Sequence, residues 1–223
     1  GSKLKQLVYR DPIKSSQQFS VYEEPIKDHI YACIVDVSRG KGLDYSAFQL
    51  IDVTDMPYRQ VCVYRDNNIT PIDYAEIIHR TIERYNEAYT LIEINDIGEQ
   101  VAEVLHYEFE CESLLNTESA GRSGKRVSTG FGKNSDKGVR TTKSVKSIGC
   151  NMLKMLVEQD QLILNDFQTI NELSTFSRKG VSYEAESGCH DDLVMGLVLF
   201  AWLTDQMFFR EITDINTLQK LRS

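Results

Sequence analysis

Apolar and polar positions near the start of the chain follow the two-residue period of β-strands. Residues 29–38 contain a short apolar run, and residues 46–54 and 58–65 alternate between apolar and polar side chains. Such patterns are typical of strands. Because the connections are short, we expect the three strands to form an antiparallel meander. The polar residues 1–27 predict a linker or an N-terminal arm that follows the edge of the sheet.

Further along, the apolar spacing becomes that of helices separated by short strands. Residues 71–87 and 97–107 have helical spacing, and the apolar segment 89–94 between them predicts a strand. Thr70 and Pro71 are typical of the cap and the first residue of a helix. The pattern also predicts a strand near 111–115, a helix over 141–159, a strand at 162–164, a helical turn and hairpin within 167–186, and a buried helix over 190–207 that is apolar nearly all round.

This order of elements predicts an α/β fold. An antiparallel three-strand meander, then alternating helices and strands and a buried helix, indicates a mixed sheet with parallel strands and helices on both faces. The same order is that of the ribonuclease H-like fold, which we expect over residues 28–210, with a tail at 211–223. No apolar run approaches the roughly 20 residues of a membrane helix. Five scattered cysteines without a CxxC pair favour a reducing cytoplasm.

The net charge of −8 conceals a basic segment. Residues 117–147 carry eight basic and two acidic side chains, so this segment has a charge of +6 and the remainder −14. Residues 116–138 are rich in Gly, Ser, Thr and Lys without a period, which predicts a long loop. A basic segment in an acidic protein is a candidate phosphate-binding element, and a solvated loop is the alternative.

Carboxylates interrupt three of the apolar segments. Asp36 lies late in the first strand, Glu93 lies in the strand at 89–94, and the pair Asp191-Asp192 opens the last apolar helix. A buried, unpaired carboxylate costs roughly several kcal/mol, so such positions are unusual. Each has a structural alternative: a turn cap for Asp36, an edge-facing surface position for Glu93, and a helix cap for the aspartate pair.

Together these acids form a donor set for divalent cations. Carboxylate oxygens suit Mg²⁺ or Mn²⁺, and two such ions about 3.5–4 Å apart can clamp a phosphodiester. The first and fourth strands are neighbours in a ribonuclease H-like sheet and the last helix packs across them. We therefore expect Asp36, Glu93 and Asp192 to converge. Asp44, across a turn from Asp36, is a further candidate ligand, with turn capping as its alternative.

Basic residues beside this predicted site are candidates for binding DNA phosphates. Lys143 and Lys146 are three residues apart and share a helix face, and Arg140 precedes them. Lys137 belongs to the same basic segment. His190, next to the aspartate pair, is interpreted as a structural or DNA-contacting residue rather than a metal ligand. Contacts of this kind are largely independent of DNA sequence.

At these residues the chain resembles the C-terminal nuclease domain of the large terminase of T-even-type tailed bacteriophages, the ATP-driven DNA-packaging motor protein. The resemblance covers about 28–210, and its most specific feature is HDDLVM before an apolar helix. It implies that the metal-binding acids are Asp36, Glu93 and Asp192, with Asp191 as the reserve and Asp44 nearby. The matching stretches are IVDVSRGKGLDYSAFQLIDVTD, LIEIND, TTKSVKSIGCNMLKMLVEQDQLIL and TFSRKGVSYEAESGCHDDLVMGLVLFAWL.

The resemblance also implies a function and its setting. It implies an endonuclease that cuts concatemeric double-stranded DNA when packaging starts and ends, by phosphodiester hydrolysis with two Mg²⁺ or Mn²⁺ ions. The resemblance also implies a packaging ATPase domain, which carries a P-loop. This chain has no GxxxxGK[ST] motif, so we expect that domain upstream. The portal protein and the small terminase subunit are expected partners, without a membrane. The expected location is the host cytoplasm, at the procapsid portal during packaging.

Three other interpretations remain open from the sequence. The first is a non-catalytic DNA-gripping or portal-docking module in which the acids are structural. The second is an actin-like phosphotransferase, which shares the strand order but needs Gly-rich phosphate loops after both halves, where only 38–42 qualifies. The third is a transposase or junction resolvase with the same acids. The HDDLVM motif and the match over 141–164 argue against it.

Overall fold

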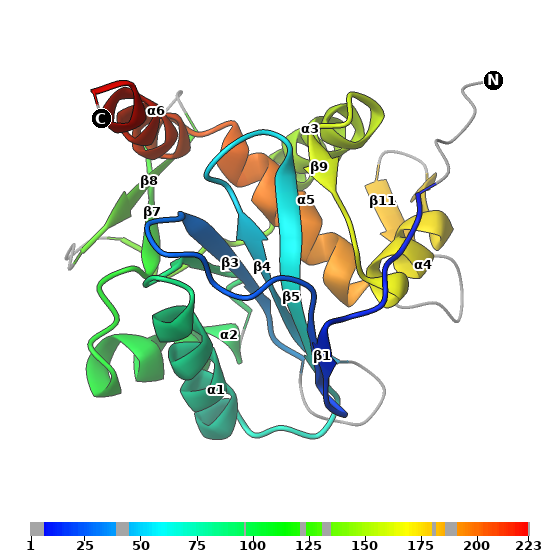
Figure 1. Ribbon diagram of the computed structural model, residues 1–223. Coiled ribbons are helices and arrows are strands. Elements are labelled where there is room, and N and C mark those ends of the chain that lie inside the picture. The colour runs from blue at the N-terminus through cyan, green and yellow to red at the C-terminus, as the bar shows by residue number, and fades with distance from the viewer. Residues whose placement is uncertain are drawn as a thin grey trace.

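A seven-stranded mixed sheet forms the centre of the computed structural model (Figure 1). The structure describes residues 7–38, 45–95, 97–120, 124–130, 135–179, 182–185 and 191–222. The strand order is β1-β2-β5-β4-β3-β6, and β9 pairs with β5. The strands are β1 (Lys14–Ser15), β2 (Phe19–Val21), β3 (Tyr31–Asp36), β4 (Ser46–Asp52), β5 (Tyr58–Asp66), β6 (Tyr89–Ile92) and β9 (Leu162–Ile163).

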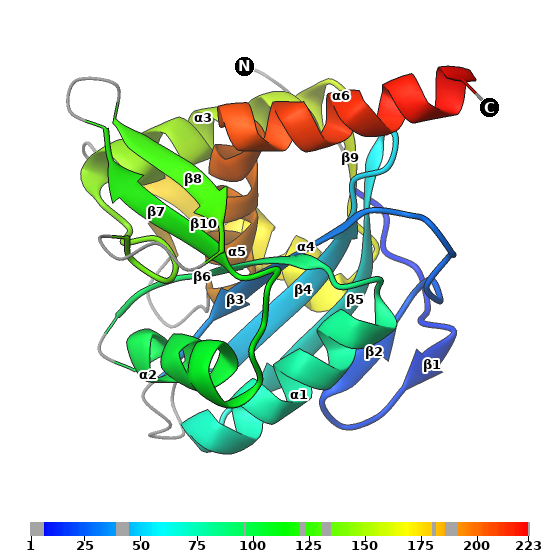
Figure 2. The ribbon, with the colours of Figure 1, turned by 90° about the vertical axis from the view of Figure 1, so that its left-hand side faces the viewer.

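Helices cover both faces of this sheet, as Figures 1 and 2 show. One face carries α1 (Pro71–Arg84) and α2 (Gly98–Glu103), which continues into a π-helical turn (Val104–Glu108); the other carries α3 (Lys143–Glu158) and α5 (Asp192–Thr204). The antiparallel meander β3-β4-β5 and the parallel pairing of β3 with β6 agree with the predicted ribonuclease H-like mixed sheet. Thr70 caps α1 by accepting a hydrogen bond from the Asp73 amide, and Pro71 is its first residue.

Two apolar clusters lie on opposite faces of the sheet. Cys33 and Val35 of β3 pack with α1, whereas Ile34 of the same strand packs with α3 and α5. The long helix α5 is buried along its whole length after Asp192, as its continuous apolar sequence predicts. At Gly149 of α3, an added Cβ would lie 2.4 Å from the carbonyl oxygen of Val198, so only glycine permits this close approach of α3 to α5.

The termini are more regular than the sequence predicts. Within the polar N-terminal arm, β1 and β2 form an antiparallel pair, and β2 extends the sheet edge by pairing with β5. The expected C-terminal tail is instead part of a helix, α6 (Met207–Arg222), which lies along the top of the molecule in Figure 2. Its polar sequence lacks the apolar period by which α1 and α3 are recognised, so periodicity does not reveal it.

The predicted loop over 116–138 contains a hairpin. Strands β7 (Leu115–Ser119) and β8 (Lys125–Thr129) pair in antiparallel register, and the strand expected near 111–115 is displaced into β7. This hairpin projects beside α6 in Figure 2. Its buried residues include the polar Asn116 and Thr117, so the hairpin has no alternating apolar face to indicate a strand. The region 167–186 holds α4 (Phe167–Thr175) and the hairpin β10 (Phe176–Lys179) and β11 (Ser182–Ala185).

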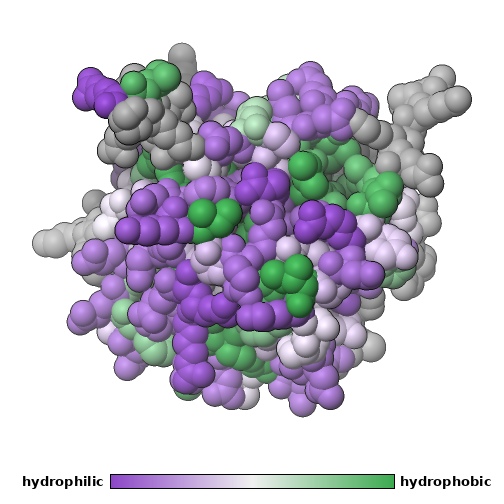
Figure 3. Space-filling model, viewed as in Figure 1, coloured by the Kyte–Doolittle hydropathy of each residue, from purple (hydrophilic) through white to green (hydrophobic). Residues whose placement is uncertain are grey.

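The surface of the molecule is mainly polar on the side seen in Figure 1. Figure 3 shows mainly hydrophilic residues on the face in view, with apolar residues in separate small patches. Among the described residues, no single helix is long and apolar enough to cross a membrane. Helix α5 and the first part of α6 meet these criteria only when taken together, and the two are bent by 73° relative to each other. The four cysteines of the described part, Cys33, Cys62, Cys111 and Cys150, are buried free thiols.

Asp52, at the end of β4, is buried and hydrogen-bonded to three neighbouring side chains. Its carboxylate accepts hydrogen bonds from Arg59 (3.0 Å), His29 (2.7 Å) and the Thr54 hydroxyl (2.6 Å). Burial raises the pKa of Asp52, but the bonds from Thr54 and His29 outweigh it and leave the pKa below its usual value.

We expect Asp52→Ala to lower the free energy of unfolding by about 2–3 kcal/mol at pH 7, because it leaves buried donors without an acceptor. Urea unfolding measures the loss, with exposed Asp11→Ala as the control. The stabilisation is present above the unfolded pKa of about 3.9 and is lost as the pH falls through the lower folded value. If Asp52→Ala lowered the free energy of unfolding as much at pH 3 as at pH 7, the stabilisation would not come from the ionised Asp52 carboxylate.

Candidate active site

The strands β3 and β6 direct two carboxylates toward α5. Ile34 and Leu91 face the cluster formed with α3 and α5, and residues two positions further along a strand share the same face. Asp36 and Glu93 are these residues. The Glu93 amide donates to the carbonyl oxygen of Val35 (2.9 Å), so the parallel register places the two acids side by side at one end of the sheet.

The start of α5 brings two more acids to the same end of the sheet. Asp191 is the N-cap residue and Asp192 is the first residue of the helix. The structural alternative of a helix cap does not hold for Asp191, because its side chain makes no cap hydrogen bond to the helix. Both aspartates are half-buried, while Leu193 and Val194 directly after them are fully buried. The burial of the apolar residues of α5 therefore holds the two aspartates at its start partly inside the fold.

Electrostatics show that the four acids lie close together. Asp36 is half-buried, and its pKa is raised well above the usual range. The causes, in decreasing order, are burial, the charge of Glu93, a hydrogen bond shared with the Glu93 side chain, and the charges of Asp192 and then Asp191. The structure thus brings Asp36, Glu93 and Asp192 to one end of the sheet, while their role as metal ligands and the choice of Asp192 over Asp191 stay predictions.

The cluster is open rather than a closed ligand cage. Among the described residues, no three His, Cys, Asp or Glu side chains are already arranged to hold a metal ion. Asp36 and Glu93 share a hydrogen bond, which draws one carboxyl group toward the other. The neighbouring negative charges favour the protonated form of Asp36, and a bound cation would replace that proton. Asp44 and His190, two further predicted site residues, lie outside the residues that the structure describes.

Thr141 is a residue of this site that the sequence analysis missed. Its hydroxyl donates to Glu93 Oε1 (2.8 Å), while the neighbouring Thr142 caps α3 by accepting from the Val145 amide. The segment reaches Glu93 because Val139 pairs with the end of β6. Gly138 allows this approach, since an added Cβ would lie 2.3 Å from a β6 carbonyl oxygen and its φ is +147°. The Thr-Thr pair before a helix is the signal that could have indicated both roles.

Glu172 is a second missed residue beside the acids. It lies on α4, is 1% exposed, and accepts a hydrogen bond from the Leu193 amide (3.2 Å). Burial raises its pKa to about 8, the charge of Arg65 opposes this, and the charges of Asp192 and Asp191 add to it. Residues 167–175 are mostly polar, so an acid there is ordinary and the sequence carries no signal for this role.

The predicted DNA-binding residues begin directly beside the acids. Arg140 precedes Thr141, is exposed, and lies 3.8 Å from Asp136. Lys143 is the first residue of α3 and Lys146 lies one turn later. Lys137 is placed differently, because its ammonium group lies 5.0 Å from the centre of the Tyr107 ring. The structure thus places the basic start of α3 next to Glu93, and Lys137 against an aromatic side chain.

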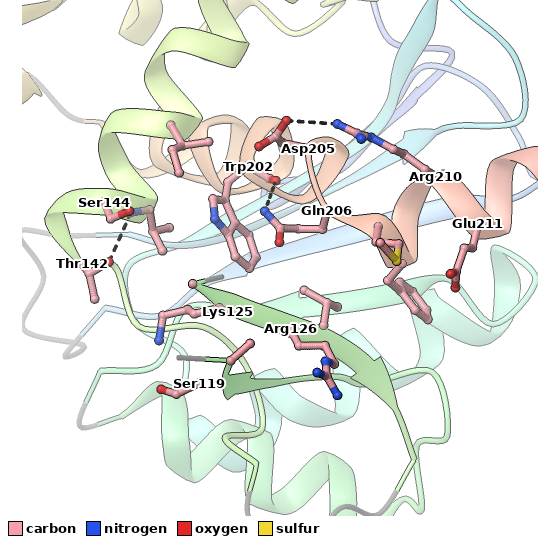
Figure 4. A pocket seen from close by; sticks show the side chains of 17 residues that line it. Ser119, Lys125, Arg126, Thr142, Ser144, Trp202, Asp205, Gln206, Arg210 and Glu211 are labelled. Atoms are coloured by element: carbon pink, nitrogen blue, oxygen red, sulfur yellow. Dashed lines mark hydrogen bonds and ion pairs between the residues drawn. The ribbon is translucent and has the colours of Figure 1, made fainter. Parts of the chain in front are cut away.

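A cavity of about 950 Å³ lies away from these acids, between the β7–β8 hairpin, the start of α3 and the junction of α5 with α6 (Figure 4). Trp202, Asp205 and Arg210 line it, and Asp205 accepts a hydrogen bond from Arg210 (3.3 Å). Trp202 and Asp205 lie at the far end of α5, on the order of 15–20 Å along the helix from Asp192, and Arg210 lies on α6. None of the four acids lines the cavity, whereas Thr142, next to the site residue Thr141, does.

Comparisons with known proteins identify the family and the fold of the chain. The family model described as the terminase RNaseH-like domain matches residues 33–201, which contain Asp36, Glu93 and Asp192. The large terminase nuclease of thermophilic phage G20c is 25% identical, with a TM-score of 0.62 over 86% of this chain and 91% of that one. The same nuclease with bound magnesium is 24% identical, with a TM-score of 0.64 over 88% and 92%.

Another solved relative is the nuclease domain of the large terminase of Thermus phage P74-26. It is 23% identical, with a TM-score of 0.61 over 86% of this chain and 88% of that one. The G20c nuclease has also been solved with bound cobalt and with bound zinc. These matches confirm the predicted terminase resemblance and ribonuclease H-like fold, while the T-even type stays a prediction. The chain belongs to the terminase RNase H-like domain family, the family of phage large-terminase nuclease domains.

Proposed function

We propose that the chain is a metal-dependent DNA endonuclease that uses Asp36, Glu93 and Asp192 to hold two Mg²⁺ or Mn²⁺ ions. The observation that carries the proposal is the placement of Asp36 and Glu93 side by side at the ends of β3 and β6, with the acidic start of α5 packed against them. Burial and the negative charges of Glu93, Asp192 and Asp191 raise the pKa of Asp36, which agrees with this placement. Half-buried acids that repel one another weaken the fold, and a functional cation offsets that cost. Asp44, in the undescribed segment after β3, is a further proposed ligand.

The donor set fits such cations. Its side chains offer carboxylate oxygens, the ligands that Mg²⁺ and Mn²⁺ prefer. When bound, the ions supply an activated water and stabilise the leaving oxygen of the phosphodiester. Thr141 holds Glu93 in a fixed orientation through its hydroxyl. Because the pKa of Asp36 is raised, this carboxyl group must lose a proton before a cation binds, so the affinity for the cation should rise with pH.

The start of α3 is the proposed track for the DNA backbone. The first turn of this helix contains no acid, and Lys143 and Lys146 add positive charge to the positive end of the helix dipole. Arg140 is exposed just before them. This arrangement favours phosphate oxygens beside Glu93, without a preference for base sequence. Lys137 and His190 are retained as secondary candidates for DNA contacts.

We expect the double variant Lys143→Ala/Lys146→Ala to reduce the slope of log affinity against log salt by about two units. The reduction should be equal for unrelated DNA sequences, because phosphates carry no sequence information. Fluorescence anisotropy with labelled duplexes measures it. Lys154→Ala, an exposed lysine farther along α3, is the matched control and should leave the slope unchanged. An unchanged slope in the double variant would locate the DNA track elsewhere.

The proposed biological role is cutting concatemeric double-stranded DNA at the start and end of viral genome packaging. Support comes from membership of the terminase family. In this role a packaging ATPase domain precedes the nuclease in the full-length chain, and the portal protein and small terminase subunit are partners. The location is then the host cytoplasm, at the procapsid portal.

Digestion of supercoiled plasmid by the chain tests the proposed activity. We expect nicked and linear products in Mg²⁺ or Mn²⁺, and none when EDTA removes the cation. Products should form on plasmids of unrelated sequence, since the proposed contacts are to phosphates. A folded chain that binds DNA and cuts it in neither cation would contradict the nuclease proposal and favour the DNA-gripping alternative.

A further inference from the structure

The first turn of α5 is capped by a side chain from another helix. The amide of Leu193, at the second helical position, has no partner within a helix. It donates to Glu172 Oε2 on α4 (3.2 Å), while the side chain of the N-cap residue Asp191 makes no cap bond. The end of α5 that carries Asp192 packs against α4 in Figure 1. Glu172 therefore does the capping that a helix normally receives from its own N-cap residue.

The carbonyl group of Leu193 is held as well. It accepts a hydrogen bond from Gln49 Nε2 of β4 (2.9 Å), and Gln60 of β5 donates to Gln49 Oε1 (3.0 Å). Gly196 leaves room for this contact, because an added Cβ would lie 2.8 Å from Gln49 Nε2. Both backbone polar groups of Leu193 are thus fixed by buried side chains of neighbouring elements.

The same buried network holds α4, which carries Glu172. Gln60 also donates to the Thr169 hydroxyl (3.0 Å), and Asp166 caps α4 by accepting from the Thr169 amide (2.9 Å). Tyr22 from β2's end donates to Asp166 Oδ1 (2.7 Å). Glu172 therefore acts from a helix that is itself fixed to the sheet, so it offers a rigid acceptor to α5.

We propose that Glu172 is a positioning residue for the acid cluster, which fixes the Leu193 amide and so directs the adjacent Asp192 toward Asp36 and Glu93. The inference rests on the proposed function, because it assumes that Asp192 holds a cation. It also explains why an acid is buried here: Glu172 caps α5 and leaves the carboxylates of Asp191 and Asp192 facing the site. An apolar side chain would fill the same space without the cost of burying a carboxyl group.

Calorimetric titration with Mn²⁺ tests this role in Glu172→Met, which keeps the length of the side chain and removes its oxygen acceptor. We expect Mn²⁺ affinity to fall on the order of 10–100-fold, as is usual when a residue that orients a metal ligand is lost. Glu172→Gln retains an acceptor oxygen and should bind Mn²⁺ nearly as the wild type does. Exposed Glu158→Met on α3 is the control, and Glu172→Leu replaces Glu172→Met should the latter not fold.

Amide hydrogen exchange at Leu193 gives a readout independent of metal and of activity. Exchange should accelerate in Glu172→Met and stay slow in Glu172→Gln. Wild-type Mn²⁺ affinity in Glu172→Met would overturn the proposal, as would a Glu172→Gln variant as weak as Glu172→Met, since that would mean that the charge itself is needed. A wild type that binds no Mn²⁺ would refute the proposed function and this inference with it, even where Leu193 exchange responds as expected.

Discussion

Replacing Asp36 by Asn should reduce Mg²⁺-dependent plasmid cleavage on the order of a thousandfold or more. Loss of a ligand weakens a cation that contributes several kcal/mol to the transition state, and each 1.36 kcal/mol is a factor of ten. Glu93→Gln should have a comparable effect. Rates of plasmid nicking, measured at equal protein concentration and saturating cation, give the comparison, with exposed Asp11→Asn as the control.

The same Asp36→Asn variant should be more stable than the wild type when no metal is present. The pKa of Asp36 is raised by burial and by Glu93, so its ionised form destabilises the fold above the unfolded pKa of about 3.9. Each kcal/mol of relieved repulsion raises Tm by about 2–4 °C in a chain of this size. The gain should be present at pH 8 and absent near pH 3.5. Wild-type cleavage combined with an unchanged Tm would contradict both roles of Asp36.

The second large effect is expected at Asp192, with its neighbour as the internal comparison. Adjacent residues in a helix point about 100° apart, so one of the two aspartates faces the cations more directly. Asp192 acts on Asp36 more strongly than Asp191 does. We therefore expect Asp192→Asn to abolish cleavage and Asp191→Asn to retain a measurable rate.

Because Asp191 makes no cap bond, Asp191→Asn should leave the stability of α5 nearly unchanged. Thermal unfolding without metal and plasmid nicking with Mg²⁺ separate the two effects. An inactive Asp191→Asn beside an active Asp192→Asn would exchange their roles. Loss of activity in both variants would mean that both carboxylates contact the cations.

The central part of the fold could be predicted because its elements have strong periodic patterns. The meander, α1 and the buried helix α5 each bury a continuous apolar face, and that face is visible in the sequence. The β7–β8 hairpin and α6 were missed because their sequences lack a regular apolar period. The hairpin packs against β6 and α6, and α6 packs against α5, and a local pattern does not contain these contacts.

The acids of the site could be predicted because charge within an apolar segment is conspicuous. Asp36 and Glu93 interrupt apolar runs, and the strand order of a ribonuclease H-like sheet predicted that they lie on neighbouring strands. Thr141 and Glu172 could not be found in this way, because a hydroxyl or an acid in a polar or ambiguous segment is ordinary. Their roles depend on the contacts with Glu93 and the Leu193 amide, which only the folded chain brings within hydrogen-bond distance.

Anomalous diffraction from crystals of the chain soaked in Mn²⁺ shows directly whether the acid cluster holds two cations. We expect two peaks about 3.5–4 Å apart, bounded by the carboxylates of Asp36, Glu93 and Asp192. Both peaks should disappear or weaken in Asp36→Asn crystals soaked in the same way. Manganese peaks found elsewhere, with none between these three carboxylates in the wild type, would contradict the proposed two-cation site.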